Sequence, residues 1–394
     1  MLLINPDSGI YRDIPNLSLA YAAAALDANV VDLNAQPEPA DRYLAVEDAE
    51  VLLSVRSNTE RAAQTIRARY AVRYPRARVS SVRNAVDVLC CYPFKDWPGG
   101  VCLPPEFGDA LPLPRYDRFD SLPLFQANWR SGAWPYYLLT SLGCPFRCTY
   151  CASRKRPWRR RSVAHCMEEL REAKARWGIR RFDVIDDCFN ADRDRVLEFC
   201  EQAQALDLPW TCANGLRADR FDEAMARALK RSGCRYLSFG VESLDDTVLK
   251  TNQKGETAEQ ITQAIVTAQK YFPGRVNGFF IIGLPGSSYA SDLGTLRWAI
   301  RQGISANFSF YVDHESEAGA DPVFSGEHAA PRSEAYDRAL QQKLYDYTSY
   351  MRRHKGRRLK PLFHTLGTLR LILAFDPWRL PMHLWRYGRA RLAP

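Results

Sequence analysis

The sequence predicts an α/β protein in which a small doubly wound domain precedes a partial barrel of six strand–helix units. Three observations support this prediction. Short apolar runs alternate with amphipathic, helix-like segments through most of the 394 residues. In the larger part a helical segment follows each strand-like run, which is the arrangement of a parallel sheet. A proline-rich stretch separates the two parts, and prolines disfavour regular backbone structure.

We divide the chain into four parts on this basis. Residues 1–95 form the small α/β domain, in which "MLLINP", "NVVDLN", "AEVLLSV" and "RARVSSV" are the strand-like runs. Residues 96–135 are the proline-rich connector. Residues 136–355 form the partial barrel, with the strand-like runs "YYLLTSL", "RFDVIDD", "WTCANGL", "YLSFGVES", "GFFIIGLPG" and "SANFSFYV". Residues 356–394 form a basic carboxyl-terminal tail.

The composition, 46% hydrophobic and 25% charged, is typical of globular proteins. The net charge of +9 is concentrated at the end of the chain, because Arg352 to Pro394 contain eleven Lys or Arg against one acid, Asp376. The nearly neutral remainder argues against a general nucleic-acid-binding surface. The amino terminus lacks the features of a signal peptide, so we expect a cytoplasmic protein whose eleven cysteines are reduced thiols or metal ligands.

Three cysteines, Cys144, Cys148 and Cys151, lie within the eight residues "CPFRCTYC". They follow the first barrel strand, and parallel barrels carry their chemistry at the carboxyl ends of strands. A structural zinc site needs four ligands, and the nearest candidates, His165 and Cys166, lie inside a helical segment. Three thiolates on a short loop fit an iron–sulfur cluster that leaves one iron open.

The run "CPFRCTYC" has the CxxxCxΦC form, with Tyr150 as the aromatic Φ, and resembles the radical S-adenosylmethionine (radical SAM) enzymes. The similarity spans about residues 100 to 310. It extends to "FDVIDDCFN", "NGLRAD", "GCRYLSFGVESLDDTVLK" and "FFIIGLPGSS". These segments look like those of the subgroup that carries an amino-terminal cobalamin-binding-like domain.

The resemblance implies that Cys144, Cys148 and Cys151 hold a four-iron four-sulfur (4Fe-4S) cluster. The unique iron would be chelated by the amino and carboxylate groups of SAM. An electron from the cluster would then cleave SAM to methionine and a 5'-deoxyadenosyl radical. Tyr150 would pack beside the cluster and adenine, or would be an ordinary core residue.

Two polar positions at strand ends would meet the methionine part of SAM. Asp186 and Asp187 match, in position but not in letters, the family motif that receives the SAM amino group; the alternative is a cap for the following helix. Arg217 could pair with the SAM carboxylate through a bidentate fork. Its alternative is an ion pair with Asp219 or Asp222.

Two further strand ends would meet the nucleoside. Glu242 and Ser243 lie where the family binds the ribose hydroxyls or the methionyl part of SAM, and a carboxylate can accept two hydrogen bonds from a diol. Gly283 and Gly286 would let the backbone approach adenine closely. The alternative for the glycines is a simple turn.

Two regions have open interpretations. The small domain has no DxHxxG segment, and no histidine precedes His165, so we interpret it as degenerate and consider cobalamin possible but less favoured. The stretch "RKRPWRRRS" is either a phosphate-binding patch or, as we favour, a structural lead into a helix capped by Ser162.

The resemblance predicts an enzyme that starts radical chemistry on a small or lipid-like biosynthetic metabolite, with flavodoxin or ferredoxin as electron donor. One alternative is a cobalamin-dependent radical SAM methyltransferase. An alternative of another class is a binding or scaffold protein with a structural metal loop. The tail combines arginines with large apolar residues, so it either attaches peripherally to a membrane or closes the open side of the barrel.

Overall fold

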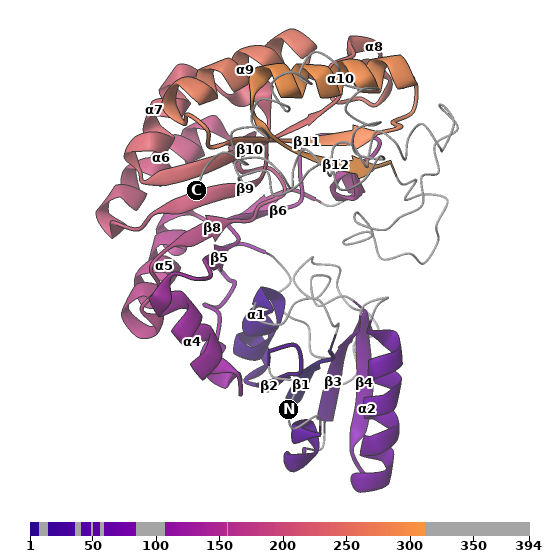
Figure 1. Ribbon diagram of the computed structural model, residues 1–394. Coiled ribbons are helices and arrows are strands. Elements are labelled where there is room, and N and C mark those ends of the chain that lie inside the picture. The colour runs from indigo at the N-terminus through magenta and orange to yellow at the C-terminus, as the bar shows by residue number, and fades with distance from the viewer. Residues whose placement is uncertain are drawn as a thin grey trace, which may run out of the picture.

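The computed structural model describes residues 1–7, 15–35, 41–48, 50–55, 59–83, 107–155 and 157–311. The basic tail, the end of the predicted barrel region and part of the connector lie outside the described residues. Figure 1 shows two α/β parts, the amino-terminal part in indigo and purple and the larger part in magenta to orange. Both sheets are built from parallel strands, and the predicted α/β fold class is confirmed.

The amino-terminal sheet has the strand order β2-β1-β3-β4. Its strands and helices are β1 (Leu2–Asn5), α1 (Leu17–Leu26), β2 (Asn29–Asp32), β3 (Glu50–Val55), α2 (Glu60–Arg73) and β4 (Arg78–Arg83). On one face, Leu3, Val30 and Leu52 pack with α1. On the other face, residues such as Ile4 and Leu53 pack with α2. The two helices therefore cover opposite faces, as in a doubly wound sheet.

The larger sheet has the order β12-β11-β10-β9-β8-β5 and is parallel throughout. Its strands are β5 (Tyr136–Leu138), β8 (Phe182–Val184), β9 (Trp210–Leu216), β10 (Cys234–Glu242), β11 (Val276–Ile282) and β12 (Ser305–Phe310). Its helices are α5 (Val163–Trp177), α6 (Arg193–Ala203), α7 (Glu223–Arg231), α8 (Asp246–Thr251), α9 (Ala258–Tyr271) and α10 (Tyr289–Gln302). The sheet curves into a partial barrel.

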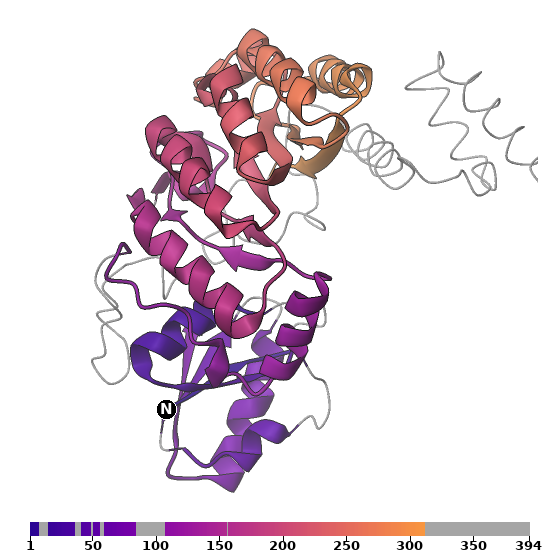
Figure 2. The same ribbon diagram turned by 90° about the vertical axis from the view of Figure 1, so that its left-hand side faces the viewer.

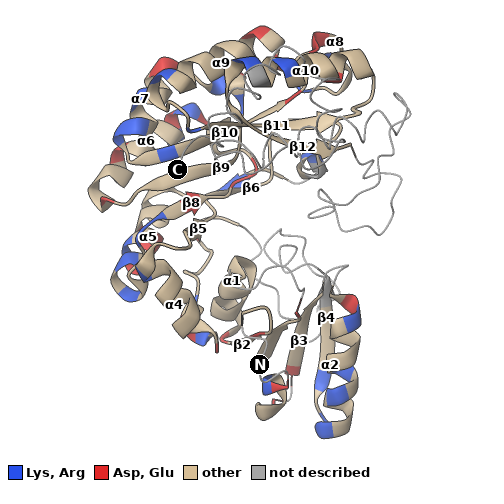
Figure 3. Ribbon diagram, viewed as in Figure 1, with Lys and Arg blue, Asp and Glu red and all other residues tan. Residues whose placement is uncertain are grey.

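The helices of the barrel cover the outer face of the sheet, and Figure 2 shows them in front of the strands. Figure 3 shows that charged residues of the described part lie mainly on helices and loops, with few on the barrel strands. Parallel strands buried on both faces are expected to be apolar. No helix among the described residues is long and apolar enough to cross a membrane.

The first predicted barrel strand, "YYLLTSL", is divided in the structure. β5 ends at Leu138, and β6 (Ser141–Leu142) pairs antiparallel with β7 (Arg159–Arg160). The break falls at Thr140, whose backbone N–H donates to Asp186 Oδ1 at 2.7 Å instead of to a neighbouring strand. This side-chain bond to a residue 46 positions away ends the ladder.

Tyr21 of α1 links the amino-terminal part to a buried ion pair of the barrel. Arg161 and Glu169 are each 1% exposed, and their charged atoms are 2.6 Å apart. Tyr21 of α1 and Tyr136 of β5 donate their hydroxyls to the Glu169 carboxylate at 2.9 and 2.8 Å. Ser162 caps α5 by accepting from the His165 N–H, so the arginine block leads into a helix as expected. Arg161, one of the arginines of "RKRPWRRRS", thus has a structural role.

The connector also takes part in this interface. It contains α4 (Leu122–Ser131), whose Trp129 is buried against Tyr116 with ring centroids 5.0 Å apart. Tyr116 in turn contacts Tyr136 edge to face. Aromatic packing of this kind, together with the buried ion pair, gives the two parts one continuous core.

Candidate functional site

The cysteine loop, residues 144–151, lies at the carboxyl ends of the barrel strands. Cys148 is buried, whereas Cys144 and Cys151 are partly exposed. The residues that hold the loop follow β8, β9 and α8, as described below. The three cysteines therefore lie at the mouth of the barrel, where the sequence analysis expected them. Among the described residues, no group of three or more His, Cys, Asp or Glu side chains is arranged to hold a single metal ion.

Two contacts hold the middle of the cysteine loop. The guanidinium of Arg217, which follows β9, lies over the Phe146 ring, 3.7 Å from its centroid. The Thr149 backbone N–H donates to the Asn252 carbonyl at 3.0 Å, and its hydroxyl donates to Asn252 Oδ1 at 3.1 Å. Asn252 also donates to the Pro285 carbonyl at 2.8 Å, so one buried amide links the loop to the turn after β11.

Asp186 and Asp187 have different surroundings although they are adjacent. Asp186 is 1% exposed and accepts three hydrogen bonds, from the Thr140 N–H and hydroxyl and from the Ser141 hydroxyl. Burial raises its pKa, and these bonds oppose the rise. Asp187 is exposed at the mouth and accepts from the Gly143 N–H at 2.9 Å and the Ser153 hydroxyl at 2.8 Å. Asp192, not this pair, caps α6.

Arg217 is already engaged by the protein. Its Nε donates to Asp219 Oδ1 at 2.8 Å, and its Nη1 donates to the Lys254 carbonyl at 2.9 Å. Its other face contacts Phe146. The sequence analysis offered an ion pair with Asp219 or Asp222 as the alternative to a bond with the SAM carboxylate, and the structure has the ion pair with Asp219. The fork of this arginine thus braces the cysteine loop against the end of β9.

Glu242, at the end of β10, faces Lys254. Lys254 Nζ lies 2.9 Å from Glu256 Oε2 and 3.9 Å from Glu242 Oε1. Burial raises the pKa of Glu242 to about 7, with Lys254 opposing the rise and Glu256 adding to it. Glu242 also has a φ of +64°, which is costly for a residue with a side chain. A Cβ on Gly240 would lie 2.9 Å from Glu242 Oε1 and 3.2 Å from Lys254 Nζ, so a larger residue there would displace the ends of these two side chains.

The remaining predicted residues surround this centre. Tyr150 is partly buried beside Cys148 and Glu242, and burial raises its pKa well above the usual value. The Ser243 hydroxyl accepts from the Asp245 N–H at 3.2 Å and so belongs to the turn that starts α8. The Gly283 N–H donates to Asp292 at 2.8 Å. Gly286 has a φ of +82° and packs on Thr251 of α8.

A fourth thiol lies next to the cysteine loop. Cys188 is 3% exposed, and its thiol donates to Asn190 Oδ1 at 3.8 Å. The nearby Cys188 thiol is the main cause that lowers the pKa of the Cys144 thiol to about 7. Burial raises the pKa of Cys151 to about 11. From the sequence, only the position of Cys188 directly after Asp187 indicated that it lies near the site.

Sequence reasoning missed Phe146, Asn252 and Lys254. Phe146 lies inside the cysteine motif, so its place near the site could have been inferred. Lys254 and Asn252 belong to "TNQKGET", a polar stretch with the composition of a solvated turn. Only the fold shows that Lys254 is 5% exposed and Asn252 1% exposed.

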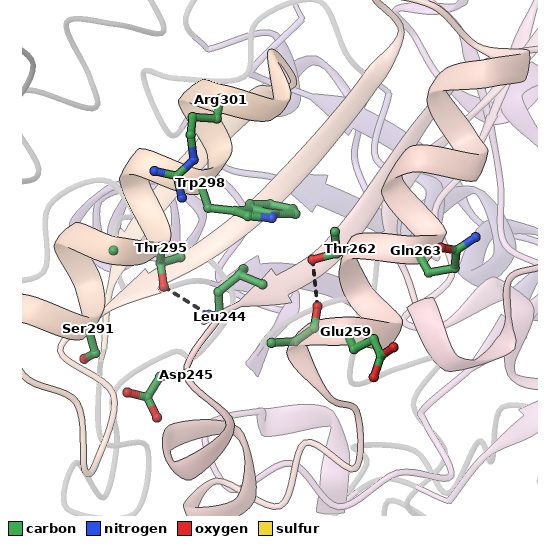
Figure 4. Close-up of a pocket in the computed structure, with 11 residues that line it drawn as sticks. Leu244, Asp245, Glu259, Thr262, Gln263, Ser291, Thr295, Trp298 and Arg301 are labelled. Carbon is green, nitrogen blue, oxygen red and sulfur yellow. Dashed lines mark hydrogen bonds between the residues drawn. The ribbon is translucent and has the colours of Figure 1, made fainter. Parts of the chain in front are cut away.

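A groove of about 590 Å³ lies beside this site, between α9 and α10. Figure 4 shows Trp298 and Leu244 at its centre, with Glu259 on one side and Arg301 on the other. The Leu244 N–H donates to Thr295 Oγ1 at 3.0 Å across the floor. The groove contains none of the cysteines and none of the residues predicted to bind SAM.

Comparison with known families and proteins gives a consistent result. Residues 138–299 match the family model of the radical SAM superfamily. An uncharacterized methyltransferase of Pyrococcus horikoshii is 32% identical over 197 residues, which cover 48% of this chain and 41% of the relative. Cytidylyl-2-hydroxyethylphosphonate methyltransferase of Streptomyces wedmorensis is 28% identical over 185 residues, covering 45% and 35%. The chain thus spans less than half the length of these two curated relatives.

Two solved structures share the fold. The radical SAM methyltransferase TsrM of Kitasatospora setae, with a tryptophan substrate and a SAM analogue bound, superposes with a TM-score of 0.60 at 17% identity, covering 79% of this chain and 72% of that one. The cobalamin-dependent radical SAM enzyme OxsB, with aqua-cobalamin bound, superposes with a TM-score of 0.61 at 18% identity, covering 90% and 56%. At these identities the likeness concerns the fold alone.

Proposed function

The chain belongs to the radical SAM superfamily, and we propose that it holds a 4Fe-4S cluster through Cys144, Cys148 and Cys151 and cleaves SAM reductively. The observation that carries this proposal is the position of the cysteine loop, which is braced over the mouth of the barrel by Arg217 and Asn252. Three thiols on one short loop suit a cluster that has one iron without a protein ligand. When bound, the cluster would supply the electron that breaks the sulfonium bond of SAM.

The residues around the loop have defined tasks in this proposal. Arg217 holds Phe146 in place, and Thr149 is fixed by Asn252, so the three thiols are presented together before any cofactor binds. Tyr150 packs against the loop beside Cys148 and excludes water from it. Asp186 maintains the bend after β5 through its three bonds, rather than contacting SAM.

Glu242 and Lys254 are the residues that we assign to SAM itself. No described residue donates a hydrogen bond to the Glu242 carboxylate, so this carboxylate can accept hydrogen bonds from the two ribose hydroxyls. The Lys254 ammonium has three donors and forms an ion pair with Glu256 Oε2 at 2.9 Å whose geometry is not that of a hydrogen bond. We therefore assign the SAM carboxylate to Lys254 instead of Arg217. The turn at Gly283 and Gly286 offers backbone to adenine.

The test is an anaerobic reconstitution followed by measurement of 5'-deoxyadenosine. Wild-type protein reduced with dithionite in the presence of SAM should form 5'-deoxyadenosine and methionine. Cys148→Ala should abolish both the iron content and the product. If the variant forms as much 5'-deoxyadenosine as wild type, the assignment of the cysteines is wrong.

A second candidate function is methyl transfer with cobalamin, and one observation favours it. Asn5 and Asp32 are the last residues of β1 and β2, Ser54 is the last but one of the adjacent β3, and all three are buried. Asn5 donates to Asp32 Oδ1 at 2.9 Å, whereas Asp32 Oδ2 and Ser54 Oγ have no hydrogen-bond partner among the described residues. Ligands bind at this edge of doubly wound sheets. Unpaired acceptors there suit the amide side chains of a corrinoid.

The two candidates differ in their products. Methyl transfer leaves S-adenosylhomocysteine as the product. If the protein uses cobalamin, it should also bind hydroxocobalamin, which is detected by its visible absorbance. Asp32→Leu should weaken that binding, whereas Asp194→Asn on the surface of α6 should not, because the Asp194 side chain is 95% exposed. Absence of corrinoid binding would leave cleavage without cobalamin as the function.

The substrate, the electron donor and the location remain proposals. We propose a small or lipid-like biosynthetic metabolite as substrate and a flavodoxin or ferredoxin as donor. Peripheral membrane attachment would depend on the basic tail. Sedimentation with liposomes tests it, since binding should increase with anionic lipid and be lost when residues 360–394 are removed.

A further inference from the structure

One carboxylate spans the two ends of the cysteine loop. Asp187 Oδ2 accepts the N–H of Gly143, the residue before Cys144, at 2.9 Å. Asp187 Oδ1 accepts the hydroxyl of Ser153, two residues after Cys151, at 2.8 Å. We propose that Asp187 is a positioning residue that clamps the cysteine loop closed and so retains the cluster. This inference rests on the proposed function, because it concerns the site that would hold the cluster.

The base of this clamp is rigid. Asp186, the preceding residue, is fixed to the bend after β5 by its three hydrogen bonds. Arg195 is 9% exposed and donates to the Thr140 carbonyl and the Arg161 carbonyl, which ties the same bend to α6. Asn190, fully buried, pairs with the backbone of Arg217 through two bonds. Asp187 therefore projects from a segment that cannot follow the loop if the loop opens.

The other contacts of the loop do not replace the clamp. Phe146 and Thr149 are held near the middle of the loop. The β6–β7 ladder pairs Leu142 with Arg159, so it joins the chain outside the segment 143–153 that Asp187 spans. Fixing both ends reduces the conformational freedom that nine intervening residues would otherwise have.

The clamp differs from the role first expected for Asp187, contact with the SAM amino group. A clamp acts on the cluster, so its loss should speed the release of iron. A SAM contact acts on the substrate, so its loss should raise the KM for SAM and leave iron release unchanged. Because Asp187 is exposed, we take its two hydrogen bonds at the low end of the usual range, and together they correspond to roughly a 5- to 30-fold change in an equilibrium.

The experiment measures iron release to a chelator from anaerobically reconstituted protein. Asp187→Ala, which loses both bonds, should release iron roughly 5 to 30 times faster than wild type. Asp187→Asn should be intermediate, because its amide nitrogen cannot accept a hydrogen bond. The matched control is Asp183→Asn on β8, the strand that precedes Asp187; the Asp183 carboxylate accepts from the Thr211 hydroxyl at 2.7 Å, away from the loop. It should behave as wild type.

A second measurement does not need the cluster. In cluster-free protein, amide hydrogen exchange of the peptide that contains Gly143 should be faster in Asp187→Ala than in wild type or in Asp183→Asn. Unchanged iron release and unchanged exchange in Asp187→Ala would overturn the clamp. If wild type takes up no cluster at all, the proposed function fails, while the exchange measurement still decides whether Asp187 holds the loop.

Discussion

Replacing Glu242 by Gln should stabilise the protein at neutral and alkaline pH while weakening SAM binding. Burial raises the pKa of Glu242 from its ordinary value of 4.5 to about 7. Between these two values the folded protein keeps a proton that the unfolded chain has lost, so stability falls as pH rises from 4.5 to 7 and is constant above. A shift of this size corresponds to about 3 kcal/mol, since one pKa unit is about 1.4 kcal/mol.

The assay is urea unfolding of cluster-free protein between pH 5 and 8. Glu242→Gln removes the titrating carboxyl, and Lys254 keeps Glu256 at 2.9 Å, so the variant should be more stable than wild type by up to about 3 kcal/mol at pH 8. The gain should shrink toward pH 5. Glu198→Gln, at an exposed position of α6, is the control and should show no such trend.

A variant that is less stable than wild type at pH 8 would refute the reasoning, as would a difference that does not change with pH. Either result would mean that Glu242 is a structural ion-pair partner of Lys254. The φ of +64° at this position points the other way, because strained residues concentrate at functional sites.

Three further predictions test the framework around the site. Arg161→Met should cost about 3–5 kcal/mol in urea unfolding, because it leaves the Glu169 carboxylate buried without its cation; adding Glu169→Met should recover most of the loss, and additive effects would contradict the buried pair. Cys188→Ser should keep the iron content of reconstituted protein, and loss of iron would make Cys188 a ligand. Arg217→Ala should speed iron release, since it frees Phe146; unchanged release would mean that the stack does not hold the loop.

Much of the fold follows from local sequence patterns. The six strand-like runs and the helices between them predict a parallel sheet because each pattern lies within a dozen residues. The division of the first run could not be predicted in this way. It depends on the bond between Thr140 and Asp186, which are 46 residues apart, and no local pattern contains that information.

The candidate site shows the same limit. The three cysteines can be recognised because their spacing lies within eight residues. The roles of the two adjacent aspartates cannot be recognised in this way, because they depend on contacts with distant residues. Asp186 turns inward to the bend and Asp187 outward to the loop, and a sequence cannot say which is which. Lys254 was missed for a related reason, since a lysine in a polar turn gives no sign that the turn folds into the barrel.

The measurement that tests the central claim most directly is the electron paramagnetic resonance spectrum of the dithionite-reduced protein, recorded with and without SAM. The account predicts the signal of one reduced 4Fe-4S cluster per chain, and a change in that signal when SAM binds the open iron. Cys148→Ala should lack the signal. A protein that instead holds one tetrahedral zinc ion, or whose cluster signal does not respond to SAM, would contradict the account.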